Sequence, residues 1–207
     1  APAAESHHGC VDHLGQLDLL VSDLQNAVMK TRMQPIGRLF QKYPRIARDL
    51  ARNLGKEVEL VLAGEETEID KTMIEDLSDP IIHLIRNAVD HGVESALERT
   101  AAGKPEKSEV RLEARQEGDH IVILIADDGR GMNAEKLRAK ALEKGLINNE
   151  EANTMDERQS FNLVFLPGFS MAPKVSDVSG RGVSMDVVRT NIQKLNGSIE
   201  IKSELGK

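Results

Sequence analysis

The stretch HLIRNAVDHG at residues 83–92 decides the fold, together with ADDGRGM at 126–132 and SGRGVSMDVV at 179–188. The first stretch continues a helical pattern, because its apolar residues recur every three or four positions. The other two are glycine-rich turns, one predicted after a strand and one before a helix. Their order and spacing along the chain carry more information than any one of them alone.

The helix that contains the first stretch is predicted over residues 71–91, and Pro80 is a potential point of interruption. One face of this helix is apolar and is expected to be buried. The residues that form this face are Ile81, Ile82, Leu84, Ile85, Ala88 and Val89.

The other face of this helix presents His83, Asn87 and the pair Asp90–His91, at spacings i, i+4 and i+7/i+8. An asparagine on a polar stripe of a mostly buried helix needs partners for its amide. A hydrated Mg²⁺ meets that need, because Mg²⁺ prefers oxygen ligands and is shared with phosphates. The alternative is that Asn87 caps a neighbouring backbone. A zinc site is disfavoured, because His83 and His91 lie two turns apart and no third ligand is evident.

The second stretch places Asp127 at the end of a predicted strand, followed by Gly129 and Gly131 in the spacing DxGxG. A carboxylate at a strand end, beside glycines that allow close backbone approach, suits hydrogen bonding to an exocyclic amine such as that of adenine. An ordinary Asp-Gly turn is the structural alternative.

The third stretch places Gly180 and Gly182 before a helix predicted over 183–196. Glycines at a helix N-terminus leave backbone N–H groups free to meet phosphate, and the helix dipole favours the anion. The pattern is not a dinucleotide fingerprint, because Met185 stands where a third glycine would be. It is not a P-loop either, since the chain has no GxxxxGKS/T.

A heptad seam predicts a helix over residues 11–34, with Pro35 at its end. Such a narrow apolar seam needs a partner helix, which is either a helix of a dimerising bundle or the rest of the chain. The seam residues are Cys10, Leu14, Leu17, Val21, Leu24, Val28 and Thr31.

The remaining pattern alternates helices with strands, and one pair of strands is a clear antiparallel hairpin. The predicted fold is an α/β two-layer sandwich of a mixed β-sheet and helices, preceded by one long helix. The other predicted elements are a helix over 36–54 that kinks or breaks at Pro44, strands over 58–64, 109–116, 120–128 and 198–203, and helices around 94–102, over 133–145 with Asn133 as N-cap, and over 149–160.

Composition excludes several classes of protein. The chain has 207 residues, 40% of them hydrophobic, and a net charge of −7, which disfavours a nucleic-acid partner. No apolar run approaches the roughly 20 residues that span a bilayer, so we expect no direct membrane insertion. The single cysteine fits a reducing compartment, and a cytoplasmic location is expected. Residues 1–9 are interpreted as linker or appended residues.

The stretches HLIRNAVDHG, DDGRGM, FLPGFS and SGRGVSMDVV, in this order, resemble the four nucleotide-binding boxes of the GHKL (Bergerat) ATP-binding fold. Within that group, HxxxNxxDH at 83–91, LPGFS at 166–170 and MKTRMQPIGRLF at 29–40 resemble the CheA class of chemotaxis histidine kinases. The resemblance implies part of a dimerisation domain at residues 10–35. It implies an ATP-binding catalytic domain at residues 36–207, with a truncated C-terminal strand.

The resemblance also implies roles for the residues that match the family's boxes. Asn87 matches the Mg²⁺-coordinating asparagine, and His83 stands at the position that supports the metal and the phosphates. Asp90 and His91 match residues that line the nucleotide, with His91 toward the phosphates. On this basis His83, Asn87 and His91 are the expected catalytic residues, and Asn87 and His83 the expected metal site.

The glycine-rich boxes match the parts of the family's ATP-binding site that contact the base and that close over the phosphates. Asp127 resembles the adenine-reading aspartate, and Gly129 and Gly131 shape that wall of the pocket. Residues 165–182 resemble the ATP lid, with Gly180 and Gly182 at its phosphate-contacting end.

The implied function is to bind Mg-ATP and to donate the γ-phosphate to a histidine on a separate phosphoacceptor domain, in two-component chemotaxis signalling. Hydrolysing members of the fold place a glutamate four residues before the asparagine, where this chain has His83, which favours transfer over hydrolysis. The implied partners are the phosphoacceptor domain of the same kinase, a dimer partner chain, and a coupling protein and chemoreceptors reached through absent domains. The alternative is a nucleotide-binding and dimerisation module with little transfer activity.

Ser184 departs from the family's pattern, which usually has glycine at this position. Serine there costs about 1 kcal/mol if the position requires a positive φ, and little if the residue is already helical. In the first case nucleotide affinity or lid closure is expected to change.

Overall fold

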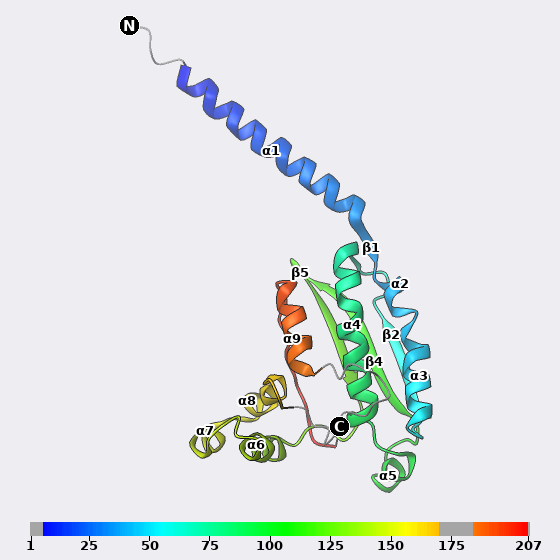
Figure 1. The fold of residues 1–207 in the computed structure, drawn as a ribbon. Coiled ribbons are helices and arrows are strands. Elements are labelled where there is room, and N and C mark those ends of the chain that lie inside the picture. The colour runs from blue at the N-terminus through cyan, green and yellow to red at the C-terminus, as the bar shows by residue number, and fades with distance from the viewer. Residues whose placement is uncertain (1–5, 170–183, 207) are drawn as a thin grey trace.

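The computed structural model describes residues 6–169 and 184–206 (Figure 1). Its centre is a mixed three-stranded sheet in the order β2 (Val58–Ala63), β4 (Ser108–Glu117), β5 (His120–Asp127). Strand β2 is parallel to β4, and β4 is antiparallel to β5. The tight connection between β4 and β5 places Gly118 at φ 64°, so the predicted hairpin is confirmed.

Helices cover one face of this sheet. They are α3 (Tyr43–Asn53), α4 (Lys71–Asn87) and α9 (Met185–Lys194), as Figure 1 shows. Along β4 the side chains alternate between the buried face and the exposed face, as expected for a sheet covered on one side only. The predicted two-layer sandwich of a mixed sheet and helices is confirmed.

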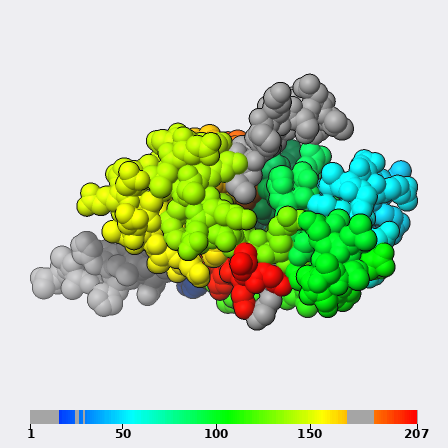
Figure 2. Space-filling view, turned by 90° about the horizontal axis from the view of Figure 1, so that it is seen from below, coloured from blue at the N-terminus to red at the C-terminus, as the bar shows by residue number. Residues whose placement is uncertain are grey.

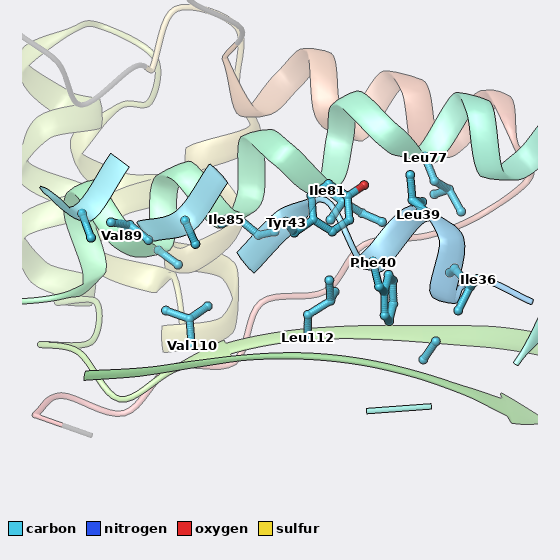
Figure 3. Close-up of a cluster of buried hydrophobic side chains, with 14 of the residues drawn as sticks. Ile36, Leu39, Phe40, Tyr43, Leu77, Ile81, Ile85, Val89, Val110 and Leu112 are labelled. Atoms are coloured by element: carbon cyan, nitrogen blue, oxygen red, sulfur yellow. The ribbon is translucent and has the colours of Figure 1, made fainter. Parts of the chain in front are cut away.

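The main hydrophobic core fills the space between α4 and the sheet (Figure 3). It is mostly aliphatic, because aromatic residues make up only 2% of the chain. Burying each of its large aliphatic side chains contributes about 1.5–3 kcal/mol. Fully buried members of this core include Ile36, Phe40, Tyr43, Ile81, Ile85, Val89, Val110 and Leu112.

The N-terminal helix α1 spans Ser6–Arg32 and projects away from the sheet (Figure 1). It begins inside the segment interpreted as linker and ends two residues before the predicted end. The reason for the early end is that β1 (Met33–Pro35) pairs antiparallel with β3 (Glu68–Asp70). The seam side chains Leu17 and Leu24 are 62% and 67% exposed. The side chains of Cys10 and Leu14 lie outside the described residues.

Proline has different effects at two positions in the helices. The predicted break near Pro44 is confirmed, since α2 (Gly37–Phe40) ends and α3 begins at Tyr43. Helix α4, in contrast, runs through Pro80 without interruption. Pro80 is buried against the core, and this packing offsets the missing backbone hydrogen bond.

The segment predicted as one helix over 149–160 is two helices, so that prediction was wrong. Helix α7 (Asn149–Thr154) and helix α8 (Glu157–Asn162) each begin with a reciprocal capping box. The second box joins Asp156 and Gln159, and it restarts the helix at a new angle. The short helix α5 (Ala96–Ala101) also begins with such a box.

A second, smaller core surrounds α6 (Ala134–Glu143), whose predicted N-cap Asn133 accepts from the Lys136 N–H at 2.9 Å. Helix α8 and the 3₁₀ turn η2 (Leu163–Phe165) complete its wall. The side chains at its centre are Leu137, Ala141, Phe161, Leu163 and Phe169, with Ile201 packed against them.

The predicted strand at 198–203 is not formed in the described part of the chain. The segment contacts the turn after β5 instead, where the Met132 N–H donates to Ser203 Oγ at 2.8 Å and the Gly206 N–H to the Arg130 carbonyl at 2.9 Å. Figure 2 shows these C-terminal residues (red) between the helices of the second core and the region of α5. Alternating polarity predicted a strand, but in the described residues this segment pairs with no strand and contacts the turn after β5.

We predict that Gly64→Ala strongly destabilises the chain. Gly64 has φ 70°, and an added Cβ would lie 1.7 Å from the Ala114 carbonyl oxygen, which belongs to the backbone of β4. The backbone conformation alone costs about 1–2 kcal/mol for alanine, and overpacking adds about 1–3 kcal/mol. Chemical denaturation measures the loss. Gly55→Ala is the matched control, because Gly55 has φ 64° and open space around it. Equal losses in both variants would contradict the predicted clash.

Candidate functional site

The α-helix that carries the first stretch ends at Asn87 and continues as one π-helical turn, η1 (Ala88–Gly92). Turns of this kind are rare and occur often at functional sites. Asp90 and His91 lie on this turn, so the α-helical spacing that predicted a shared face with His83 does not apply to them. Both side chains are about half exposed.

Lys56, from the segment between α3 and β2, stabilises the π-helical turn by hydrogen bonds to two of its carbonyls. Its Nζ donates to the Val89 carbonyl at 2.9 Å and to the Asp90 carbonyl at 2.6 Å. These carbonyls lie where the helical hydrogen-bond pattern changes, so the lysine satisfies acceptors that the helix no longer serves. Burial lowers the pKa of Lys56, and nearby Asp90 opposes that shift.

His83 and Asn87 lie on the last turns of α4, facing α9. Burial lowers the pKa of His83, and the nearby Arg86 and His91 lower it further, so the neutral imidazole is favoured. Asn87 Nδ2 donates to the sulfur of Met185 at 3.0 Å. This contact joins the first stretch to the third, since Met185 is the first residue of α9.

Asp127 ends β5, and its carboxylate is half-buried against two glycines. The Gly129 N–H donates to Asp127 Oδ1 at 3.1 Å. A Cβ added at Gly92 would lie 2.7 Å from the same oxygen, and one at Gly129 would lie 2.1 Å from the Gly92 carbonyl. Burial raises the pKa of Asp127, and the Gly129 hydrogen bond partly opposes this rise. Gly129 is therefore required by close packing against the Gly92 backbone, whereas Gly92 faces only the Asp127 carboxylate.

The turn after β5 also binds the end of η1 directly, because the Arg130 N–H donates to the Gly92 carbonyl at 2.9 Å. Gly131 has φ 68°, and a Cβ there would lie 2.2 Å from the Glu204 carbonyl. The first two stretches therefore meet at Gly92. Gly180 and Gly182 lie outside the described residues, as does the predicted lid beyond residue 169.

Charged residues that the sequence interpretation did not single out also meet at this turn. Arg99 is fully buried, and its Nη2 lies 2.8 Å from Asp128 Oδ2. Burial would raise the pKa of Asp128, but hydrogen bonds from Ser108 and Arg99 outweigh that effect and lower it. Glu94 and Lys104 complete the group, with an ion pair of 2.9 Å. The sequence predicted a helix around 94–102 in this connection, and nothing in its local pattern indicated this network.

Ser184 does not adopt the conformation in which serine is costly. Its φ is −86° and its ψ is 164°, so it is an extended residue at the N-cap of α9. Its hydroxyl hydrogen-bonds the side chain of Asp186 in the first turn of that helix. The expected cost of about 1 kcal/mol for a positive φ therefore does not arise.

A shallow surface hollow of about 360 Å³ reaches Asp127 and Asp128 from the exposed face of the sheet. It is also lined by Glu109, Arg111 and Ala126, and Asn87 is not among its residues. Because Gly92 packs on the other side of the Asp127 carboxylate, this hollow is separate from the site formed by the three stretches.

Comparison with known proteins identifies the family of this chain. The family described as histidine kinase-, DNA gyrase B- and HSP90-like ATPase matches residues 76–207. The chain belongs to this ATPase family. It therefore has the mixed α/β fold of the GHKL ATPases, and ATP binding is implied by membership.

Individual relatives show which members of the family the chain resembles. The chain is 56% identical to the sensor histidine kinase CheAY of Helicobacter pylori over 193 residues, 93% of this chain and 24% of the relative. It is 49% identical to the chemotaxis protein CheA of Treponema pallidum over 191 residues, 92% of this chain and 23% of that protein. The chain therefore corresponds to the ATPase domain of CheA-type histidine kinases of chemotaxis signalling. It spans about a quarter of the length of these relatives.

One solved structure resembles the fold weakly. The histidine kinase domain of the Erythrobacter litoralis blue-light activated histidine kinase has a TM-score of 0.36 and 15% identity, covering 63% of this chain and 50% of that one. In the described ranges, no helix is long and apolar enough to cross a membrane.

The residues present fit a magnesium ion that is shared with a phosphate ligand. Within residues 6–169 and 184–206, no three His, Cys, Asp or Glu side chains cluster to hold a metal. Mg²⁺ commonly takes one or two protein oxygens and completes its shell with water and phosphate. With Asn87 Nδ2 directed to Met185, the amide oxygen is the donor atom that Asn87 offers.

We predict that Gly92→Ala weakens nucleotide binding with little loss of stability. The nearest atoms to the added Cβ all belong to the Asp127 side chain, which can rotate away where a backbone could not. Affinity for ATP, measured by calorimetry, is expected to fall about tenfold. Gly103→Ala is the control, because Gly103 has open space around it. Wild-type affinity in Gly92→Ala would contradict the predicted contact.

The lowered pKa of His83 predicts a specific pH dependence of stability. The folded chain binds fewer protons than the unfolded chain between the lowered value and the ordinary pKa of 6.5. This contribution to stability is complete above about pH 6.5 and is lost as the pH falls toward the lowered value. His83→Gln is expected to flatten this part of the profile of denaturation midpoints. Parallel profiles for the two chains would exclude His83 as the group responsible.

Proposed function

We propose that this chain binds Mg-ATP and donates the γ-phosphate to a histidine on a separate phosphoacceptor domain. The observation that carries the proposal is the contact of Asp127 with Gly92, the last residue of the η1 turn that continues α4. This packing holds a potential base-reading carboxylate beside the helix whose last residue is Asn87. A base-reading group and a metal-binding group on adjoining walls suit a nucleoside triphosphate with its cation.

Asp127 is the proposed reader of adenine. An ionised carboxylate accepts a hydrogen bond from the exocyclic amine, and a half-buried acceptor left without a partner is costly. Gly129 and Gly131 keep side chains out of the space beside this carboxylate. Asp90 is proposed to line the nucleotide between the base and the phosphates.

The phosphate end is assigned to Asn87, His83 and His91. The amide oxygen of Asn87 would hold Mg²⁺, which supplies charge neutralisation at the phosphates when bound. His83 supports the metal and phosphates as a neutral imidazole, in keeping with its lowered pKa. Gly180 and Gly182 are proposed to offer backbone N–H groups at the N-terminal side of α9.

The residue four positions before Asn87 favours transfer of the γ-phosphate to a histidine over hydrolysis of ATP. Hydrolysing members of the fold place a glutamate there, which orients water as a general base. Here the position is His83, whose lowered pKa and half-buried location make it a weak base for that purpose. Positioning of an incoming histidine nucleophile then supplies the catalysis.

The partners follow from the exposed helix and from the length of the relatives. Residues 10–35 are proposed as part of a dimerisation domain and residues 36–207 as the catalytic domain. The exposed seam residues Leu17 and Leu24 suit a dimer partner chain in the cytoplasm. The phosphoacceptor histidine, the coupling protein and the chemoreceptors are proposed to be reached through other domains. The same seam favours a second candidate function, a nucleotide-binding and dimerisation module with little transfer activity.

Calorimetry and phosphate transfer together test the proposal. ATP is titrated with and without Mg²⁺, and γ-labelled ATP is then offered with and without a phosphoacceptor domain. Asp127→Asn is expected to lower ATP affinity about tenfold or more, because the amide offers a weaker acceptor. Asn87→Asp is expected to change the Mg²⁺ dependence of binding, because it adds a charge to a ligand.

The label is expected on the acceptor domain only. Lys107→Gln is a control for both titrations, because Lys107 pairs with Glu59 at the surface, away from Asp127. Binding without transfer would favour the nucleotide-binding module. Steady phosphate release without an acceptor would favour a hydrolase. If neither Asp127→Asn nor Asn87→Asp alters binding, the assignment of the site is wrong.

A further inference from the structure

A network of four charged side chains lies behind the Asp127 turn, and no step of the proposed function uses it. Glu94, Arg99 and Lys104 come from the connection between η1 and β4, and Asp128 follows Asp127 directly. Arg99 is 0% exposed and Glu94 is 8% exposed. Burying ions is costly unless every charge is paired, and such networks are retained in some proteins because they specify geometry.

Arg99 is bound at each of its nitrogen atoms. Its Nε donates to the Pro105 carbonyl at 2.7 Å, and its Nη2 donates to Asp128 Oδ2 at 2.8 Å. Its Nη1 donates to Glu94 Oε2 at 3.2 Å and to the Asp128 carbonyl at 3.1 Å. The guanidinium therefore fixes both the side chain and the peptide of Asp128. A planar fork of this kind leaves its acceptors little freedom.

Lys104 is bound by three acceptors at once. Its Nζ donates to Glu94 Oε1 at 2.9 Å, to the Asp128 carbonyl at 3.0 Å and to the Gly129 carbonyl at 2.6 Å. The lysine thus holds the two successive peptide carbonyls after Asp127. No donor of its ammonium group is left for solvent.

One of the peptide carbonyls that this network binds belongs to Gly129, and Gly129 also orients the Asp127 carboxylate. Gly129 donates its N–H to Asp127 Oδ1 at 3.1 Å, while its own carbonyl accepts from Lys104. Asp128 is held from the sheet as well, because the Ser108 hydroxyl and the Glu109 N–H donate to its Oδ1. The carboxylate that faces Gly92 is therefore supported by Lys104 through Gly129 and by the buried Arg99 through Asp128.

We propose that Arg99 and Lys104 are positioning residues that fix the Asp127 carboxylate and thereby set the selectivity of the site for a base with an exocyclic amine. The inference rests on the proposed role of Asp127 in reading adenine. A fixed, half-buried acceptor discriminates strongly against a base that lacks the amine, because it then stays unpaired. If the carboxylate is free to turn toward water, leaving it unpaired costs much less, and the site discriminates less against a base without the amine.

The test compares two nucleotides that differ only in the amine. The affinity of the 207-residue chain is measured by calorimetry for ATP and for purine riboside triphosphate, which is ATP without its 6-amino group. The variants are Lys104→Gln, Arg99→Lys and Asp127→Asn, and the double variant Lys104→Gln/Asp127→Asn. Lys107→Gln is the matched control, since it removes the same charge from the same connection but pairs with Glu59 at the surface.

Lys104→Gln is expected to weaken ATP binding about fivefold to tenfold and to leave the affinity for purine riboside triphosphate unchanged. Lys107→Gln is expected to preserve the wild-type ratio of the two affinities. In the Asp127→Asn background, Lys104→Gln is expected to cause no further loss of discrimination. Arg99→Lys keeps the positive charge but loses the planar guanidinium that binds Asp128, so discrimination between the two nucleotides is expected to fall in this variant too. Arg99→Lys replaces Lys104→Gln in the test if Lys104→Gln does not fold.

The test distinguishes failure of the positioning role of Arg99 and Lys104 from failure of the proposed role of Asp127. If Asp127→Asn abolishes discrimination while Lys104→Gln and Arg99→Lys retain the wild-type ratio, the positioning role is wrong and the proposed function stands. An equal loss for both nucleotides in these variants also overturns it, because that is the effect of a structural role alone. If Asp127→Asn leaves discrimination unchanged, the proposed reader of adenine is wrong, and the inference fails with it.

Discussion

The contact between Gly92 and the turn after β5 is the constraint on which the site depends. The Gly92 carbonyl accepts from Arg130, and the space where Cβ atoms would stand at Gly92 and Gly129 is filled by the opposite backbone and by the Asp127 carboxylate. Between Gly92 and the turn after β5, the described structure has only backbone and the Asp127 carboxylate within reach of these two positions. Because the backbones meet directly, small displacements of either element move the Asp127 carboxylate relative to Asn87.

The sequence predicted the parts of the fold that depend on local periodicity and on turn chemistry. The apolar face of α4, the β4–β5 hairpin and the N-cap at Asn133 each follow from residues close together in the chain. The glycines of the DxGxG turn after β5 indicated a close backbone approach, and the structure shows one between Gly129 and Gly92. The capping box of Asp156 and Gln159 was present in the sequence as well, and it marked the start of α8, which the interpretation missed.

Other features depend on residues distant in sequence, and local pattern could not predict them. The π-helical turn at Ala88–Gly92 contains good α-helical residues, and Lys56 stabilises it from another element. The alternation in 198–203 is genuine, but in this segment the Ser203 hydroxyl accepts from the Met132 N–H after β5, and no strand pairs with it among the described residues. Arg99 is charged, yet fully buried, and its acceptor Asp128 lies after β5, 29 residues further along the chain. In each case the deciding partner belongs to another segment.

The junction at Asp70 has a mechanical consequence. Asp70 caps α4 through the Thr72 N–H at 2.8 Å, and it also pairs with Arg32, the last residue of α1, at 3.3 Å. The ion pair is half exposed and weak, so the β1–β3 ladder is the firmer link. A rotation of α1, about 40 Å long, therefore acts as a lever on the first turn of α4. The other end of α4 is Asn87, so the junction with α1 and the residue proposed to hold the metal ion lie on one helix.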